Sequence, residues 1–180
     1  MDTSTCILTR RSVRKFEARP LPRELIEEIV GIAAYAPSWK NTQIARYTVV
    51  TDPAVLEKIA SDCVLGYTHN SEIIRSCAAL AVQSVVMKRS GYERDGSFTT
   101  AQGTHWESFD AGISAQTFCL AAHEKGVGTC IMGIIDEAKA AAAIGLPEGE
   151  RVSALIAMGY PAESPKAPPR KDTSVLLRYL

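Results

Sequence analysis

Two short polar stretches of this 180-residue chain carry side chains suited to ligand chemistry. The first is TRRSVRK, in which Arg10, Arg11 and Arg14 surround Ser12 ahead of the first long apolar segment. Guanidinium groups beside a hydroxyl are well suited to binding a phosphate dianion. A solvated basic turn is an alternative of about equal weight, because runs of charge usually lie at the surface. Taken alone, the stretch leaves both interpretations open.

The second stretch is APSWKNTQ, which follows that apolar segment and ends at Gln43. The side-chain amides of Asn41 and Gln43 can donate and accept hydrogen bonds along the edge of a planar heterocycle. The alternative is a helix stop rich in turn-forming residues. Near the end of the chain, APPRK adds Arg170 and Lys171, which could equally be a solvated tail.

Several other kinds of site have little support. In GVGTCIMG, Ile131 stands where a dinucleotide-binding loop has its third glycine, and a predicted helix rather than a strand precedes it. The chain has no phosphate-binding loop of the G-x-x-x-x-G-K-[ST] type and no G-x-S-x-G motif. Its five cysteines are scattered without C-x-x-C, so we expect neither a metal site nor a disulfide framework. Free thiols fit a reducing cytoplasm.

Composition indicates a soluble globular chain that folds as a single domain over residues 1–180. Twenty basic and twenty acidic residues cancel, which argues against nucleic acid or an anionic membrane surface as a partner. No apolar run reaches the roughly 18 residues of a membrane span. The N-terminus also lacks the apolar region of a secretory signal, so we expect a cytoplasmic protein.

Hydrophobic periodicity predicts the elements that hold these stretches. An amphipathic helix over 22–36 should end before Pro37, because the residue before a proline avoids helical geometry. Its expected apolar face consists of Leu25, Ile29, Ile32 and Ala33. Further strands are predicted over 46–51, 79–87, 129–132 and 153–158, and further helices over 52–61, 104–125 and 137–144.

The helix predicted over 104–125 has two notable features. Thr104 and Glu107 have the spacing of a capping box at its start. Its many small residues would let another backbone approach, as in a buried central helix or a subunit interface; they are Ala111, Gly112, Ser114, Ala115, Ala121 and Ala122. The polar, glycine-bearing segment 88–103 before it is predicted to be a long loop or lid. The proline-bearing tail over 160–180 should be extended.

Four motifs occur in a fixed order along the chain: RRSxR, PSxxNxQ, GxGTCxMG and MGYP…PPRK. Together they resemble the nitroreductase family of FMN-dependent flavoproteins, over residues 8–171. The resemblance implies an α+β fold of three layers (α/β/α) with a mainly antiparallel central sheet. It also implies an intertwined homodimer with FMN at its interface and with the tail over 160–180 on the partner subunit.

The resemblance also implies a role for individual residues. The FMN phosphate and ribityl contacts would be Arg10, Arg11, Ser12 and Arg14, with Arg170 and Lys171 as a second pair. The turn that meets the partner's flavin would be Pro37, Ser38 and Trp39, with the amides of Asn41 and Gln43 on the polar edge of the ring. Backbone N–H groups of Met132 and Gly133 would face the flavin N5 side. One departure is Ile44-Ala45 after Gln43, where the family usually has Pro-Trp.

The implied activity is hydride transfer from NADH or NADPH through FMN to an electron-poor acceptor such as a nitroaromatic or a quinone, by a ping-pong mechanism. The flavin carries the chemistry, so no side chain is assigned as catalytic. The alternative is a flavin-binding storage or sensor protein without useful turnover. Steady-state oxidation of NADH with a quinone separates the two.

Overall fold

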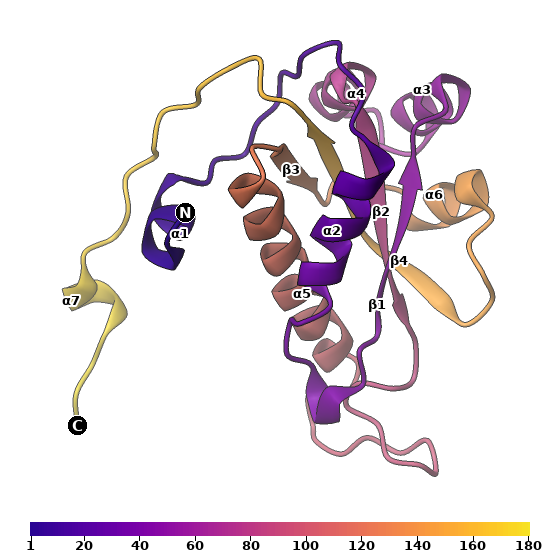
Figure 1. The fold of residues 1–180 in the computed structure, drawn as a ribbon. Coiled ribbons are helices and arrows are strands. Elements are labelled where there is room, and N and C mark those ends of the chain that lie inside the picture. The colour runs from indigo at the N-terminus through magenta and orange to yellow at the C-terminus, as the bar shows by residue number, and fades with distance from the viewer.

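A four-stranded antiparallel sheet forms the centre of the computed structural model, which describes residues 1–180 (Figure 1). The strands are β1 (Ala45–Val50), β2 (Ala79–Val86), β3 (Gly128–Met132) and β4 (Glu150–Gly159), in the order β1-β2-β4-β3. The helices are α1 (Thr3–Thr9), α2 (Arg23–Ala33), α3 (Pro53–Asp62), α4 (Thr68–Ser76), α5 (His105–Glu124), α6 (Glu137–Ile144) and α7 (Thr173–Leu176), with a short 3-10 turn η1 (Trp39–Asn41).

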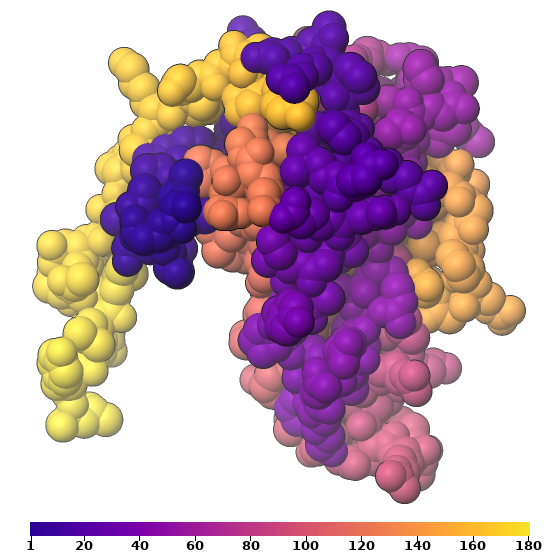
Figure 2. All heavy atoms as spheres, viewed as in Figure 1, coloured from indigo at the N-terminus to yellow at the C-terminus, as the bar shows by residue number.

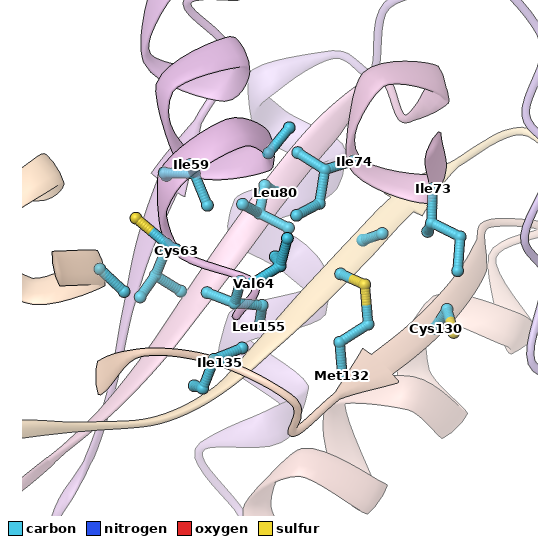
Figure 3. Packing of buried hydrophobic residues seen from close by; sticks show 14 of the residues in the cluster. Ile59, Cys63, Val64, Ile73, Ile74, Leu80, Cys130, Met132, Ile135 and Leu155 are labelled. Atoms are coloured by element: carbon cyan, nitrogen blue, oxygen red, sulfur yellow. The ribbon is translucent and has the colours of Figure 1, made fainter. Parts of the chain in front are cut away.

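Helices cover both faces of this sheet, because strand side chains alternate between two apolar clusters. On β2, Leu80 and Val82 pack into the cluster with α3, α4 and α6, whereas Ala79 and Ala81 pack against α2 and α5. Figure 3 shows the first cluster, in which Leu80 lies against side chains of α3 and α4. The expected α+β fold with an antiparallel sheet between helical layers is therefore confirmed.

Local signals predicted several element ends correctly. The Asp52 carboxylate accepts a hydrogen bond from the Ala54 N–H at 2.8 Å and caps α3. Gly145 ends α6 with a φ of 62°, a left-handed conformation that glycine adopts without steric cost. The expected strands are present with ends shifted by one to three residues, since strand ends depend on which partner residues are available.

The apolar face predicted for α2 is partly wrong. The buried residues are Ile26, Ile29 and Ala33, whereas Ile32 is 38% exposed and the helix ends at Ala33 rather than near Pro37. Ile26 and Ile32 flank the apolar face of α2 on opposite sides, so periodicity alone allows either residue to be buried. The position of α5, against which α2 packs, selects the side that is buried.

The capping box predicted at the start of α5 is also wrong. Thr104 has helical backbone angles (φ −65°, ψ −12°) and its side chain makes no capping bond. The Glu107 carboxylate instead accepts a hydrogen bond from the Lys88 N–H at 2.6 Å and lies 3.7 Å from the Arg151 guanidinium. A distant donor therefore replaces the local one, because Glu107 is buried beside the chain that leaves β2.

The segment before α2 crosses the end of the sheet where β3 begins. The Val13 N–H donates to the Thr129 carbonyl at 2.9 Å, and the Ala162 N–H donates to the Lys15 carbonyl at 2.9 Å. A β-carbon at Gly128 would lie 2.9 Å from the Val13 side chain, so only glycine allows this approach. These contacts hold the basic stretch beside both β3 and the start of the tail.

Four elements had no clear sequence signal: α1, η1, α4 and α7. Of these, α1 buries only Cys6, so it has no apolar stripe for periodicity to detect. After Pro161 the chain has no regular structure except α7. Figure 2 shows the end of this tail (yellow) away from the sheet and α5, whereas its first part lies against the N-terminal segment. No helix combines the length and apolar character that crossing a membrane requires.

Candidate functional site

The basic stretch and the tail, more than 150 residues apart, meet around a cavity of about 310 Å³. Its lining residues are Arg10, Arg11, Ser12, Arg14, Pro165, Lys166, Pro168 and Arg170. We call this the cationic cavity. Its residues come from the four positions of the RRSxR motif and from the prolines and cations of the tail, so the structure brings both predicted basic groups together.

None of the five cations in this lining pairs with a carboxylate. Guanidinium groups of Arg11 and Arg170 donate instead to backbone carbonyls of their own segments, Leu8 at 2.8 Å and Pro168 at 3.1 Å. The Nε of Arg10 is buried and has no hydrogen-bond partner. Buried donors are almost always paired in folded proteins, so an unpaired one among free cations indicates an anionic ligand. A phosphate monoester, such as that of FMN, fits this donor set.

The tail is joined to the basic stretch by Glu163, whose carboxylate accepts a hydrogen bond from the Arg14 backbone N–H at 2.6 Å. This bond fixes the backbone of Arg14, whose guanidinium donates to the Ser12 carbonyl at 3.2 Å and has no carboxylate partner. Lys171, a predicted site residue, is exposed and does not line the cavity. Lys166 was missed because it lies outside the APPRK motif that identified Arg170, although it is a cation of the same proline-bearing tail.

A second cavity of about 560 Å³ adjoins the first and shares Arg10 and Arg11 with it. His123 lies in its wall, with Nε2 2.9 Å from the Thr9 hydroxyl. Burial, followed by the positive charges of Arg10 and Arg11, lowers the pKa of His123. The imidazole therefore senses the positive potential of the cationic cavity.

The turn from Pro37 to Gln43 has an unusual backbone. Lys40, Asn41 and Gln43 have φ values of 45°, 55° and 48°, in the left-handed region that non-glycine residues seldom occupy. Two acceptors hold this shape: the Ser38 hydroxyl takes the Gln43 N–H at 2.9 Å, and the Asp110 carboxylate takes the Trp39 N–H at 3.0 and 3.2 Å. Backbone strain of this kind persists only where the surroundings impose it, and it clusters at functional sites.

The turn also contains unpaired buried donors. Trp39 Nε1 and Thr42 Oγ1 are buried without a hydrogen-bond partner, and Arg10 Nε is the third such side-chain atom of the chain. All three therefore lie in the two predicted ligand-binding stretches. This coincidence marks the turn and the cationic cavity as the places where the isolated chain leaves polar groups for something else to contact.

A third cavity, of about 320 Å³, lies behind the turn. Pro37, Ser38 and Gln43 line it, whereas Trp39 and Asn41 do not. Ile44 and Ala45, the two positions where the chain departs from the family pattern, are also in its wall. This cavity and the cationic cavity have no lining residue in common, so a single chain does not bring the turn to the arginines.

Met132 and Gly133 lie at the end of β3. The Met132 side chain points into the apolar cluster under α3 and α4, as Figure 3 shows, and is 3% exposed. Only its backbone could therefore face a ligand. Gly133 is exposed, and neither residue lines the cationic cavity or the cavity behind the turn.

Comparison with known proteins agrees with this geometry. A sequence profile described as the Nitroreductase family matches residues 7–160. The chain is 31% identical to a putative NADH dehydrogenase/NAD(P)H nitroreductase of Methanothermobacter thermautotrophicus, over 92% of this chain and 80% of that one. It is 29% identical to an NADH dehydrogenase of Thermus thermophilus, over 91% of this chain and 88% of that one.

A solved structure shares the fold. The NADPH:FMN oxidoreductase of Vibrio harveyi, determined in complex with NAD+, superposes with a TM-score of 0.83 at 27% identity. The match covers 98% of this chain and 76% of that one.

Proposed function

The chain belongs to the nitroreductase family and is an NAD(P)H-dependent oxidoreductase, and from this premise we propose that it works with bound FMN. The observation that carries the proposal is the cationic cavity, in which five cations face one another without a carboxylate. Like charges repel, so an anion bound between these cations would be stabilised.

In this proposal the cationic cavity holds the terminal phosphate of the cofactor. Arg10, Arg11 and Arg14 supply the charge-assisted hydrogen bonds, and the Ser12 hydroxyl adds a neutral donor. Lys166 and Arg170 close the cavity from the tail, and Lys171, the next residue, remains a proposed phosphate contact. A phosphate monoester dianion suits these donors better than the singly charged diester groups of FAD, which favours FMN.

The turn from Pro37 to Gln43 would contact the ring of a flavin bound to a second copy of the chain. Its cavity has no residue in common with the cationic cavity, so we propose a homodimer in which each site is shared. Exposure of the tail supports the same arrangement: Val175, Leu176 and Leu177 are 62%, 69% and 50% exposed in the single chain. A partner subunit would cover them.

Bound FMN would supply the redox chemistry, hydride transfer from NAD(P)H to an electron-poor acceptor such as a nitroaromatic or a quinone in a ping-pong cycle. The chain contributes binding and orientation. Amides of Asn41 and Gln43 would fix the polar edge of the ring, and backbone N–H groups at Met132 and Gly133 would face its N5/O4 side. We place this activity in the cytoplasm, which the unpaired pattern of cysteines favours.

The purified protein tests this proposal directly. We expect a yellow protein whose heat-released cofactor elutes as FMN, and which oxidises NADH or NADPH only when a quinone or nitroaromatic is present. FAD as the main species would contradict the cofactor assignment. A yellow protein without turnover would favour the storage or sensor alternative.

A further inference from the structure

Helix α5 carries two buried carboxylates one turn apart. Glu107 and Asp110 are each 3% exposed. Glu107 is 3.7 Å from the Arg151 guanidinium, but Asp110 has no cation beside it. A buried carboxylate without a cation is costly unless hydrogen bonds satisfy its oxygens. The groups that bond to Asp110 are therefore the key to its role.

Those groups come from two segments that are far apart in the sequence. Both Asp110 oxygens take the Trp39 backbone N–H, at 3.0 and 3.2 Å, and Oδ2 also accepts the Ser90 hydroxyl at 2.7 Å. Ser90 is fully buried. Trp39 belongs to the turn from Pro37 to Gln43, and Ser90 belongs to the segment 88–103. One carboxylate thus joins both segments to α5.

Besides Asp110, two hydrogen bonds that involve side chains join the segment 88–103 to α5: the Lys88 N–H donates to Glu107, and Trp106 Nε1 donates to the Thr100 hydroxyl at 2.8 Å. Most of the remaining bonds of the segment are internal. The Thr99 N–H donates to the Gly91 carbonyl at 3.0 Å, and Tyr92 forms a β-bridge with Phe98. Its other polar link to the turn is exposed: Lys40 pairs with Glu93 at 3.1 Å. The rings of Trp39 and Trp106, 4.5 Å apart, join the turn to α5 and not to this segment. Exposed ion pairs contribute little to stability. The bonds of Trp39 and Ser90 to Asp110 are therefore the main buried connection between the turn and the segment 88–103.

We propose that Asp110 is a positioning residue, which holds the strained turn and the segment 88–103 in one arrangement so that the turn is ready to meet the flavin ring. This inference rests on the proposed function for its consequence, but its structural content can be measured without cofactor. A carboxylate suits the task because two oxygens can accept from the Trp39 N–H and the Ser90 hydroxyl together. An amide retains one acceptor, and alanine retains none.

Hydrogen exchange of the cofactor-free protein tests the structural content. In Asp110→Ala we expect the amides of 37–43 and of 88–92 to exchange about 10-fold faster or more, because a buried donor loses its acceptor. Asp110→Asn should restore much of the protection at 37–43. Ser90→Ala should affect 88–92 more than 37–43, because it removes only one of the two connections.

Glu107→Ala is the matched control, since Glu107 is equally buried on the same helix but its carboxylate contacts the Lys88 N–H and the Arg151 guanidinium, not the turn. It should accelerate exchange near residue 88 and leave 37–43 within about twofold of wild type. Unchanged exchange at 37–43 in Asp110→Ala would overturn the inference. So would uniform acceleration over the whole chain, in that variant and in Asp110→Asn and Ser90→Ala, because it would indicate a general loss of stability.

Flavin titration then tests the consequence. Asp110→Ala should lower the affinities for FMN and for riboflavin by the same factor, about 10-fold, because in the proposed function the turn contacts the flavin ring and not the phosphate. A loss confined to FMN would contradict the positioning role. If wild type itself binds no flavin, the proposed function fails, whereas the exchange result still decides whether Asp110 holds the two segments.

Discussion

The cationic cavity and the turn from Pro37 to Gln43 are built by opposite means, although both are proposed to hold parts of one cofactor. The cavity collects like charges from the N-terminal stretch and the C-terminal tail and leaves them without carboxylate partners. The turn collects few charges, and a buried carboxylate and a serine hydroxyl hold its strained backbone. In the proposed function, charge would attract the phosphate to the first region, whereas fixed geometry would let the second fit a planar ring.

This contrast has consequences for mutation. A cation in the cavity can be lost with little effect on the fold, because its charge is not used within the chain. Loss of a residue that holds the turn should disturb the local structure, because the left-handed backbone angles of Lys40, Asn41 and Gln43 depend on their surroundings. Three experiments, ordered from the largest expected effect, test this difference.

Truncation after Gly159 should have the largest effect, because it removes the tail from the cavity and from the proposed dimer together. The lost apolar residues include Leu176 and Tyr179, and burial of such side chains is worth roughly 1.5–3 kcal/mol each before entropy is included. We expect a monomer with little flavin, measured by size-exclusion light scattering and absorbance. The control is full-length Arg170→Ala, which should lose flavin and remain dimeric. A truncated protein that is dimeric and fully yellow would show that the tail serves neither purpose.

Arg14→Ala and Asn41→Ala should separate the two regions by ligand. Charge-assisted hydrogen bonds are worth about 1.5–3 kcal/mol. Arg14→Ala should therefore lower the affinity for FMN roughly 10- to 150-fold and leave the affinity for riboflavin almost unchanged. Asn41→Ala should weaken both flavins by a similar, smaller factor. Lys15→Ala is the control, because Lys15 is exposed and does not line the cavity. If Arg14→Ala weakens riboflavin as much as FMN, the cavity does not read the phosphate.

The smallest expected effect is a shift in the pKa of His123 when the electrostatic potential of the cationic cavity changes. Burial and the cations hold its pKa below the ordinary 6.5, so the folded protein takes up this proton less readily than the unfolded chain. Stability should therefore fall as pH decreases from about 6.5 through the folded pKa. Binding of FMN or inorganic phosphate should raise the pKa of His123, as should Arg11→Ala, measured by NMR titration. Asn41→Ala should leave it unchanged. A pKa that does not respond to phosphate would place the anion elsewhere.

Much of the fold was predictable, because its signals are local. Asp52 and Gly145 mark the ends of helices through bonds and backbone angles within a few residues. The strands are runs of β-branched or small apolar residues, and the small residues of α5 predicted a helix in close contact with its neighbours, five of the six being buried. The order of the four motifs predicted the family.

The sequence by itself determined which residue types are available: the arginines of the basic stretch, the amides of the turn and the cations of the tail. The tertiary structure alone decided which of them meet. It brought Lys166 beside Arg10, turned Glu107 from a helix cap to a bond with Lys88, and placed Asp110 between Trp39 and Ser90. The physical reason is that caps, turns and periodicity depend on neighbours in the chain, whereas a buried polar side chain takes whichever donor the packing of distant elements brings within reach.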